Sequence, residues 1–191
     1  MDLPKFQFLY AQLAAASSGD TLDDSLWNAL LNRYFPQDEF IIAQRDKLAD
    51  ATETQTTSTS RVSVIGAAAT RHVILIEHKH PSNEGQTTGW ADAAAQLTRY
   101  MLHARNENKR TLNLQETDVL PYSMYGIVSI GIHSRFCILP PTADTLHGFP
   151  GTTPVPLHVK DDSQEIVRLL NDLVEKTAPY GLSSSVESPS A

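Results

Sequence analysis

Cysteine is almost absent from the chain, which has a single one, Cys137, in 191 residues. One thiol cannot form an internal disulfide, so a disulfide-stapled scaffold is excluded. Cys137 lies in the apolar run Phe136-Cys137-Ile138-Leu139, a pattern that predicts a strand. We therefore expect a buried structural thiol rather than a nucleophile.

Basic residues are also scarce. The chain has 15 Lys and Arg residues against 22 Asp and Glu residues, and its formal net charge is −7. A surface of this sign repels polyanions as a whole, so any contact with nucleic acid must use a local basic patch. Lys109-Arg110 is one basic pair, although a solvated loop is the simpler interpretation.

Long apolar runs are missing as well. No stretch approaches the roughly 18 consecutive apolar residues of a membrane helix, so we expect an intracellular protein of the cytoplasm or nucleus, with no membrane partner. With 41% hydrophobic residues, the chain can bury one substantial core. We expect one domain over residues 1–182, with a flexible Thr- and Ser-rich loop at 46–60 and a disordered tail at 183–191.

Hydrophobic periodicity predicts alternating helices and strands. Helices are expected from Leu26 to about Pro36, from Thr88 to about Arg105, and around Ile166 to Val174. Strands are expected at 40–42, 62–65, 73–76, 125–132 and 135–139, the last two as a hairpin. This order predicts an α/β (α+β) fold, with a mixed sheet flanked by helices.

Chemically interesting side chains follow the apolar strand at 73–76. Glu77 and Lys79 are two residues apart, so in a strand they point to the same side, while His78 points to the other. A carboxylate is a ligand that Mg²⁺ prefers, and a lysine ammonium can hold an attacking water or the charge developing on phosphorus. On the following helix, Gln96 and Tyr100 are four apart and share one face.

The strand motif Glu77-His78-Lys79 followed by the helical motif Gln96-Leu97-Thr98-Arg99-Tyr100 resembles the PD-(D/E)XK nuclease superfamily, specifically its RecB-like members. Their pattern is a strand-borne Asp, then E-x-K, then a helical Q-x-x-x-Y. The resemblance spans roughly residues 22–140 and implies a restriction-endonuclease-like fold and hydrolysis of DNA or RNA that depends on Mg²⁺ or Mn²⁺. It implies Glu77 as the metal ligand, and as catalytic residues Glu77, Lys79, Gln96 and Tyr100.

One element of the family pattern is missing. The metal-binding Asp is expected on the preceding strand, where this chain has Arg61-Val62-Ser63-Val64, and the nearest upstream carboxylates are Asp46 and Asp50. Neither Arg61 nor Ser63 can replace a carboxylate. The alternative is therefore a catalytically inactive nuclease-fold protein that binds nucleic acid or a protein partner.

Two other interpretations compete with the nuclease motif. His78, His80 and Glu84 form an H-x-H-x-x-x-E string that resembles the metal motif of cupins and would suit Fe, Mn or Zn. A cupin is built from many short strands, whereas this string leads into a long helix. In the simplest interpretation, Glu77 and Lys79 are only a solvated pair at a strand end.

Overall fold

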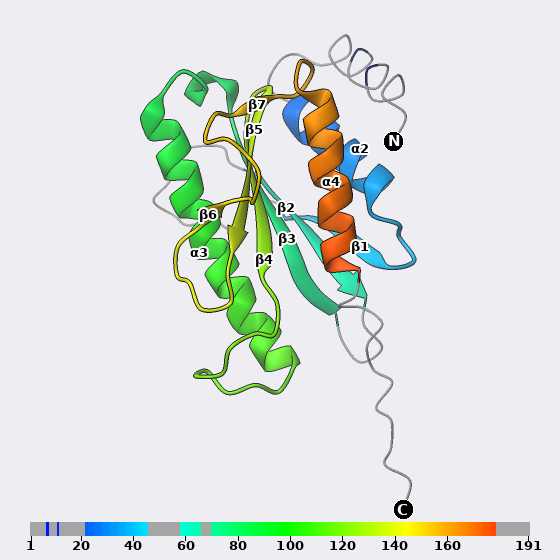
Figure 1. Ribbon diagram of the computed structural model, residues 1–191, viewed down its shortest axis with the longest axis vertical. Coiled ribbons are helices and arrows are strands. Elements are labelled where there is room, and N and C mark those ends of the chain that lie inside the picture. Colours follow the sequence, from blue (N-terminus) through cyan, green and yellow to red (C-terminus); the bar gives the residue numbers. More distant parts are fainter. Residues whose placement is uncertain (1–6, 8–10, 12–21, 46–57, 66–69, 179–191) are drawn as a thin grey trace, which may run out of the picture.

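A computed structural model describes the main chain of residues 7, 11, 22–45, 58–65 and 70–178. In these ranges a mixed sheet of seven strands is flanked by helices on both faces (Figure 1). The order of the elements is α2 (Leu22–Tyr34), β1 (Phe40–Arg45), β2 (Ser58–Ile65), β3 (Thr70–Lys79), a short 3-10 helix (Pro81–Asn83), α3 (Thr87–Thr111), β4 (Met124–Ile130), β5 (His133–Leu139), β6 (His147–Gly148), β7 (Leu157–His158) and α4 (Ser163–Thr177). The predicted fold class is confirmed.

The sheet places β3 and β4 at its centre. Its strand order is β1-β2-β3-β4-β5-β6, with β7 also paired to β5. The first three strands are antiparallel, β4 runs parallel to β3, and β5 runs antiparallel to β4. A parallel pair needs a crossover, and α3 supplies it. All seven residues of β4 are buried, as expected for a strand covered on both faces.

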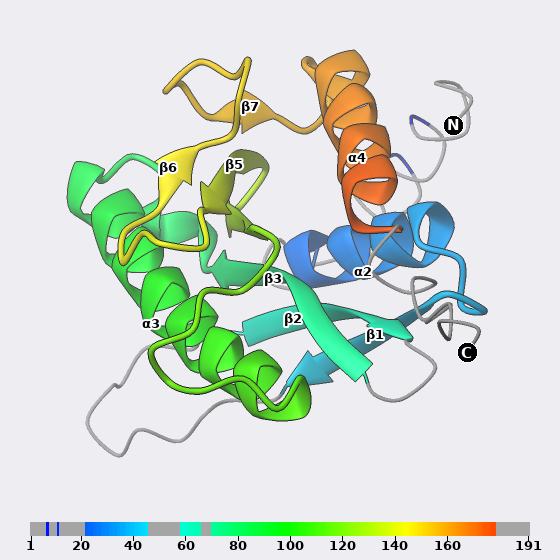
Figure 2. The same ribbon diagram turned by 60° about the horizontal axis from the view of Figure 1, so that its bottom comes forward.

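An apolar layer lies on each face of the sheet. Figure 2 shows α3 on one side and α2 with α4 on the other. On the α3 side, Leu97 and Met101 pack close to β4 because Gly126 has no side chain: a Cβ there would lie 2.9 Å from Leu97 Cδ2 and 3.0 Å from Met101 Sδ. On the other side, Trp27 of α2 donates a hydrogen bond from Nε1 to Ser129 Oγ at 2.7 Å.

Several boundaries differ from the sequence predictions. Helix α3 continues to Thr111 rather than ending near Arg105, because Asn108 anchors its last turns to β3. The Asn108 side chain accepts from His72 N at 2.9 Å and donates to His72 O at 2.7 Å. Residues 58–60, expected in the flexible loop, begin β2 instead.

Two short strands differ from the sequence predictions, and two predicted segments lie outside the described residues. The short strands β6 and β7 were not predicted. The rest of the expected loop, 46–57, and the tail 183–191 lie outside the described residues. Among the helices that the structure describes, none is long and apolar enough to cross a membrane.

Candidate functional site

Glu77 and Lys79 end β3 on the face that α3 covers. Leu75 packs in the α3 layer, and Lys79 Nζ donates a hydrogen bond to Gln96 Oε1 of α3 at 2.9 Å. Because side chains alternate along a strand, Glu77 points the same way as Leu75 and Lys79. His78 faces the opposite layer, as expected, since it pairs in register with Ser129, whose hydroxyl contacts α2.

Three of the four predicted site residues form one hydrogen-bonded string. After Gln96 accepts from Lys79, its Nε2 donates to Tyr100 Oη at 2.9 Å. The amide therefore uses its oxygen toward β3 and its nitrogen toward the next turn of its own helix, which fixes its orientation. The helical spacing of four residues brings Gln96 and Tyr100 together, as the sequence predicted.

The acid and the amine of this site are buried. Glu77 is 0% exposed and Lys79 is 6% exposed, so the interpretation as a solvated pair at a strand end is wrong. No ion pair within 4.0 Å joins these two described side chains. Within the described ranges, the one hydrogen-bond partner of Lys79 Nζ is the neutral amide of Gln96. Burying an ammonium beside a neutral group costs free energy, and such groups gather at functional sites.

The strand beside Glu77 offers no second carboxylate. Across β1, β2 and β3, Glu77 is the sole acidic residue, and its partner in β2 is Thr59. Arg61, where the family pattern would allow an Asp, instead donates to His72 Nε2 at 2.9 Å and lies 3.4 Å from Glu107 Oε2. The departure expected from the sequence is therefore real in the described strands.

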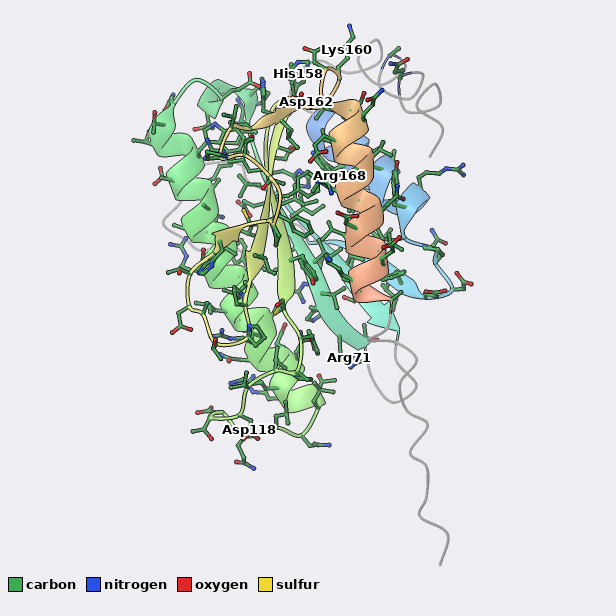
Figure 3. All side chains as sticks on the ribbon, viewed as in Figure 1. Arg71, Asp118, His158, Lys160, Asp162 and Arg168 are labelled. Carbon is green, nitrogen blue, oxygen red and sulfur yellow. The ribbon has the colours of Figure 1, made fainter. Side chains whose placement is uncertain are left out.

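Of the other candidate carboxylates upstream, Glu39 has a described side chain, and it does not complete the site. Glu39 is exposed and directly precedes Phe40. Phe40 of β1 pairs with Val64 of β2, and Val64 pairs with Arg71 of β3. Arg71 lies six residues before Glu77 on β3, or about 20 Å at the rise of a strand, and Figure 3 shows it at the end of the sheet away from His158. Asp46 and Asp50, and the side chain of Asp24, lie outside the described residues.

The described His, Cys, Asp and Glu side chains are the groups that could hold a metal ion at this site. Among them, no group of three or more His, Cys, Asp or Glu side chains is arranged to hold a metal. Glu77 alone supplies one carboxylate, whereas Mg²⁺ needs a nearly complete octahedron of oxygen ligands. The described residues therefore do not fit a Mg²⁺ or Mn²⁺ centre.

The cupin-like string does not converge either. His78 faces the α2 side of the sheet, and His80 Nδ1 accepts from Ser82 N at 3.2 Å at the start of the short 3-10 helix. Glu84 Oε1 contacts His133 Nδ1 at the beginning of β5. The metal site that this alternative predicted is not formed by the described side chains.

The contact between Glu84 and His133 belongs to a titratable cluster that the sequence analysis missed. The His133 ring lies 5.0 Å from the His158 ring at an angle of 69°, and His158 Nδ1 lies 3.1 Å from Asp161 Oδ2. Figure 3 shows His158 and Asp162 beside the start of α4. The cluster contains Glu84, His133, His158 and Asp161, which come from different parts of the chain. The spacing of residues within one helix or strand cannot predict contacts between such distant segments.

The Lys79, Gln96 and Tyr100 string and the buried Glu77 are thus the part of the nuclease pattern that the fold assembles. The acidic partner is the part that the described strands lack. No protein-family model, curated protein sequence or solved structure matches this chain.

Proposed function

We propose that the chain is a nuclease-fold protein that binds nucleic acid by accepting a backbone phosphate at Lys79. The proposal rests on the surroundings of Lys79, a residue that is 6% exposed and whose one described hydrogen-bond partner is the neutral amide of Gln96. An ammonium has further N–H donors, and it binds phosphate as a compact point charge. A phosphate oxygen would supply a further acceptor and a negative charge.

Gln96 and Tyr100 support this role by position. Gln96 holds the ammonium from the α3 side, and Tyr100 holds Gln96 through a 2.9 Å hydrogen bond. A lysine has a flexible stem, so two fixed neighbours reduce the conformational entropy that binding must otherwise restrict. The string therefore presents a pre-oriented donor, and these residue types in this order are those of the PD-(D/E)XK pattern.

The overall charge limits how the chain can bind. A formal charge of −7 disfavours broad contact with a polyanion, so few phosphates are neutralised at once. We therefore expect a weak dependence on salt. In a plot of the logarithm of the binding constant against the logarithm of the salt concentration, the slope should be about −1 to −2, which corresponds to one or two phosphate contacts. A protein partner is the alternative occupant, and a wild-type chain that binds no nucleic acid would favour it.

Metal-dependent hydrolysis of phosphodiesters is the second candidate function. The observation that favours it is the complete burial of Glu77 beside Lys79 on one strand. Arg45 pairs with Thr59, and Thr59 pairs with Glu77. The last residue of β1 and the first residues of β2 therefore lie at the end of the sheet where Glu77 lies. The segment between them contains Asp46 and Asp50. Cleavage that is lost in the double variant Asp46→Asn, Asp50→Asn would promote this candidate.

The binding proposal is tested with dye-labelled single- and double-stranded DNA and RNA. Fluorescence anisotropy in EDTA measures affinity, and incubation with Mg²⁺ or Mn²⁺ followed by electrophoresis measures cleavage. We expect Lys79→Gln to weaken binding about 10- to 100-fold, since a hydrogen bond to a charged group contributes about 1.5 to 3 kcal/mol. Lys176→Gln is the matched control, because Lys176 is exposed in the last turn of α4.

The two variants separate the site from bulk charge, since each removes one lysine ammonium. Equal affinity for Lys79→Gln and the wild type would contradict the proposal. An equal loss in both variants would also contradict it, because only the total charge would then matter. Melting temperatures of both variants show whether the fold is intact.

A further inference from the structure

A pocket of about 350 Å³ lies between α3, β5 and the connector that follows β5. Trp90 and Ala94 line it from α3, and Arg135 and Cys137 line it from β5. Its volume falls in the range of small-molecule sites, which begins at about 300 Å³. Ala94 and Gln96 are two residues apart on the helix, so the pocket and the Lys79 site lie on opposite flanks of α3.

Arg135 gives the pocket its chemistry. Its guanidinium carbon lies 4.5 Å from the centre of the Trp90 ring, and its Nε is buried with no hydrogen-bond partner among the residues that the structure describes. Trp90 is itself held by a 3.3 Å hydrogen bond from its Nε1 to Glu84 O. Buried donors are nearly always partnered in native proteins, and the planar guanidinium matches an oxyanion with two parallel hydrogen bonds. Because Arg135 also lines the pocket, its guanidinium is the group there that can pair with an oxyanion.

The remaining walls are largely apolar and held rigidly. Thr152 N donates to Phe149 O at 3.1 Å across a turn in which Pro150 is followed by Gly151 at φ 80°, the conformation of a type II turn. Thr152 Oγ1 also donates to Phe149 O, at 2.7 Å. Prolines with fixed φ follow in the same connector. The apolar side chains that line the pocket include Val128, Leu146, Val155 and Leu157.

We propose that this pocket binds a small organic oxyanion, a carboxylate or phosphate carried on a flat apolar body. Arg135 would pair with the oxyanion, and the wall formed by Val128, Leu146 and Leu157 would contact the apolar body. A single cation inside a pocket of a chain with charge −7 favours a small anion over an extended polyanion. This site is independent of phosphate binding at Lys79.

Calorimetric titration of the full chain with matched probes tests the proposal. The probes are naphthalene-2-carboxylate, 2-naphthyl phosphate, the neutral naphthalene-2-carboxamide and inorganic phosphate. We expect one or both acids to bind, with the carboxamide and inorganic phosphate at least about tenfold weaker, because each lacks one of the two recognised parts. The stronger of the two acids identifies the oxyanion. Binding of neither acid, or equal binding of the carboxamide, would overturn the proposal.

Two variants place the binding in this pocket. Arg135→Gln removes the charge and should weaken the acids at least about tenfold. Gly148 pairs with Cys137 across β5 and β6, so a side chain there would point into the pocket, and a Cβ at Gly148 meets nothing within 4 Å. Gly148→Val should therefore fold normally and block binding.

Lys79→Gln is the control that separates this site from the nucleic-acid site, and it should bind the acids as the wild type does. Unchanged affinity in a Gly148→Val variant that melts like the wild type would place the ligand elsewhere. Loss of acid binding in Lys79→Gln would likewise contradict an independent site.

Discussion

Lys79 of β3 and Gln96 of α3 are joined by a 2.9 Å hydrogen bond between two side chains that are 6% and 3% exposed. An ammonium and a neutral amide form this buried pair, so within the described residues the hydrogen-bond partner of the lysine carries no charge. A carboxylate at position 96 would neutralise the ammonium. The choice of an amide leaves the lysine able to receive an external anion.

Replacing Gln96 by Glu tests that distinction. We expect Gln96→Glu to weaken nucleic-acid binding at least about tenfold, because an internal ion pair with Lys79 would compete with a phosphate. Anisotropy with the labelled oligonucleotides measures the affinity. Thermal melting of the same variant should show no large loss of stability. Unchanged affinity in Gln96→Glu would argue that Lys79 does not contact the phosphate.

The hydrogen bond itself can be measured with a double-mutant cycle. We expect Gln96→Leu to lower the free energy of unfolding by about 1 to 3 kcal/mol, because the Lys79 ammonium loses its described partner while remaining buried. In the Lys79→Met background, Gln96→Leu should cost less, because no charge is left without a partner. Urea unfolding of the four proteins gives the coupling energy. A coupling near zero would contradict the buried pairing.

The anchor at Asn108 accounts for the length of α3 and can be removed. Asn108 is 1% exposed and makes two hydrogen bonds to the main chain of His72. We expect Asn108→Ala to lower the free energy of unfolding by about 2 kcal/mol, since a partly buried main-chain donor and acceptor lose their partners. Asn106→Ala, at an exposed position two residues earlier, is the control and should be nearly neutral.

These contacts show where sequence patterns are informative. Residues two apart in a strand and four apart in a helix have fixed relative directions, so spacing alone places Glu77 with Lys79 on one side of β3 and Gln96 with Tyr100 on one face of α3. That the two pairs meet on one side of the sheet was implied by the family resemblance and not by the spacing. Asn108 bonds a residue 36 positions away, and Glu84 contacts His133 49 positions away. Such partners depend on how the elements pack, which no local period encodes. The two-residue strands β6 and β7 are too short to show any periodicity.

Substitutions at two glycines of the connector distinguish the effect of backbone strain from the effect of steric crowding. A Cβ at either Gly148 or Gly151 meets nothing within 4 Å, but only Gly151 has a positive φ, of 80°. We expect Gly151→Ala to lower the free energy of unfolding by about 1 to 2 kcal/mol, because an L-residue is strained in that region. Gly148→Ala should change it by less than about 0.5 kcal/mol. Equal effects in urea unfolding would contradict the type II turn.

The thiol of Cys137 should lower the free energy of unfolding at alkaline pH. Burial raises the pKa of its thiol from 9.0 to about 11, although Arg135 opposes the shift. The unfolded thiol ionises first, so the stabilising contribution is complete below pH 9 and is lost as the pH rises through about 11. We expect about 2 kcal/mol less stability at pH 11 than at pH 8 from this group. Cys137→Ala should show a shallower decline, and an identical decline would contradict the assignment.

A structure of the chain with a bound oligonucleotide, obtained in EDTA so that no metal positions the strand, tests phosphate binding at Lys79 most directly. We expect a phosphate oxygen within about 3 Å of Lys79 Nζ, the usual length of a charge-assisted hydrogen bond, with Gln96 still bonded to the same ammonium. An oligonucleotide bound with every phosphate remote from Lys79 would contradict phosphate binding there.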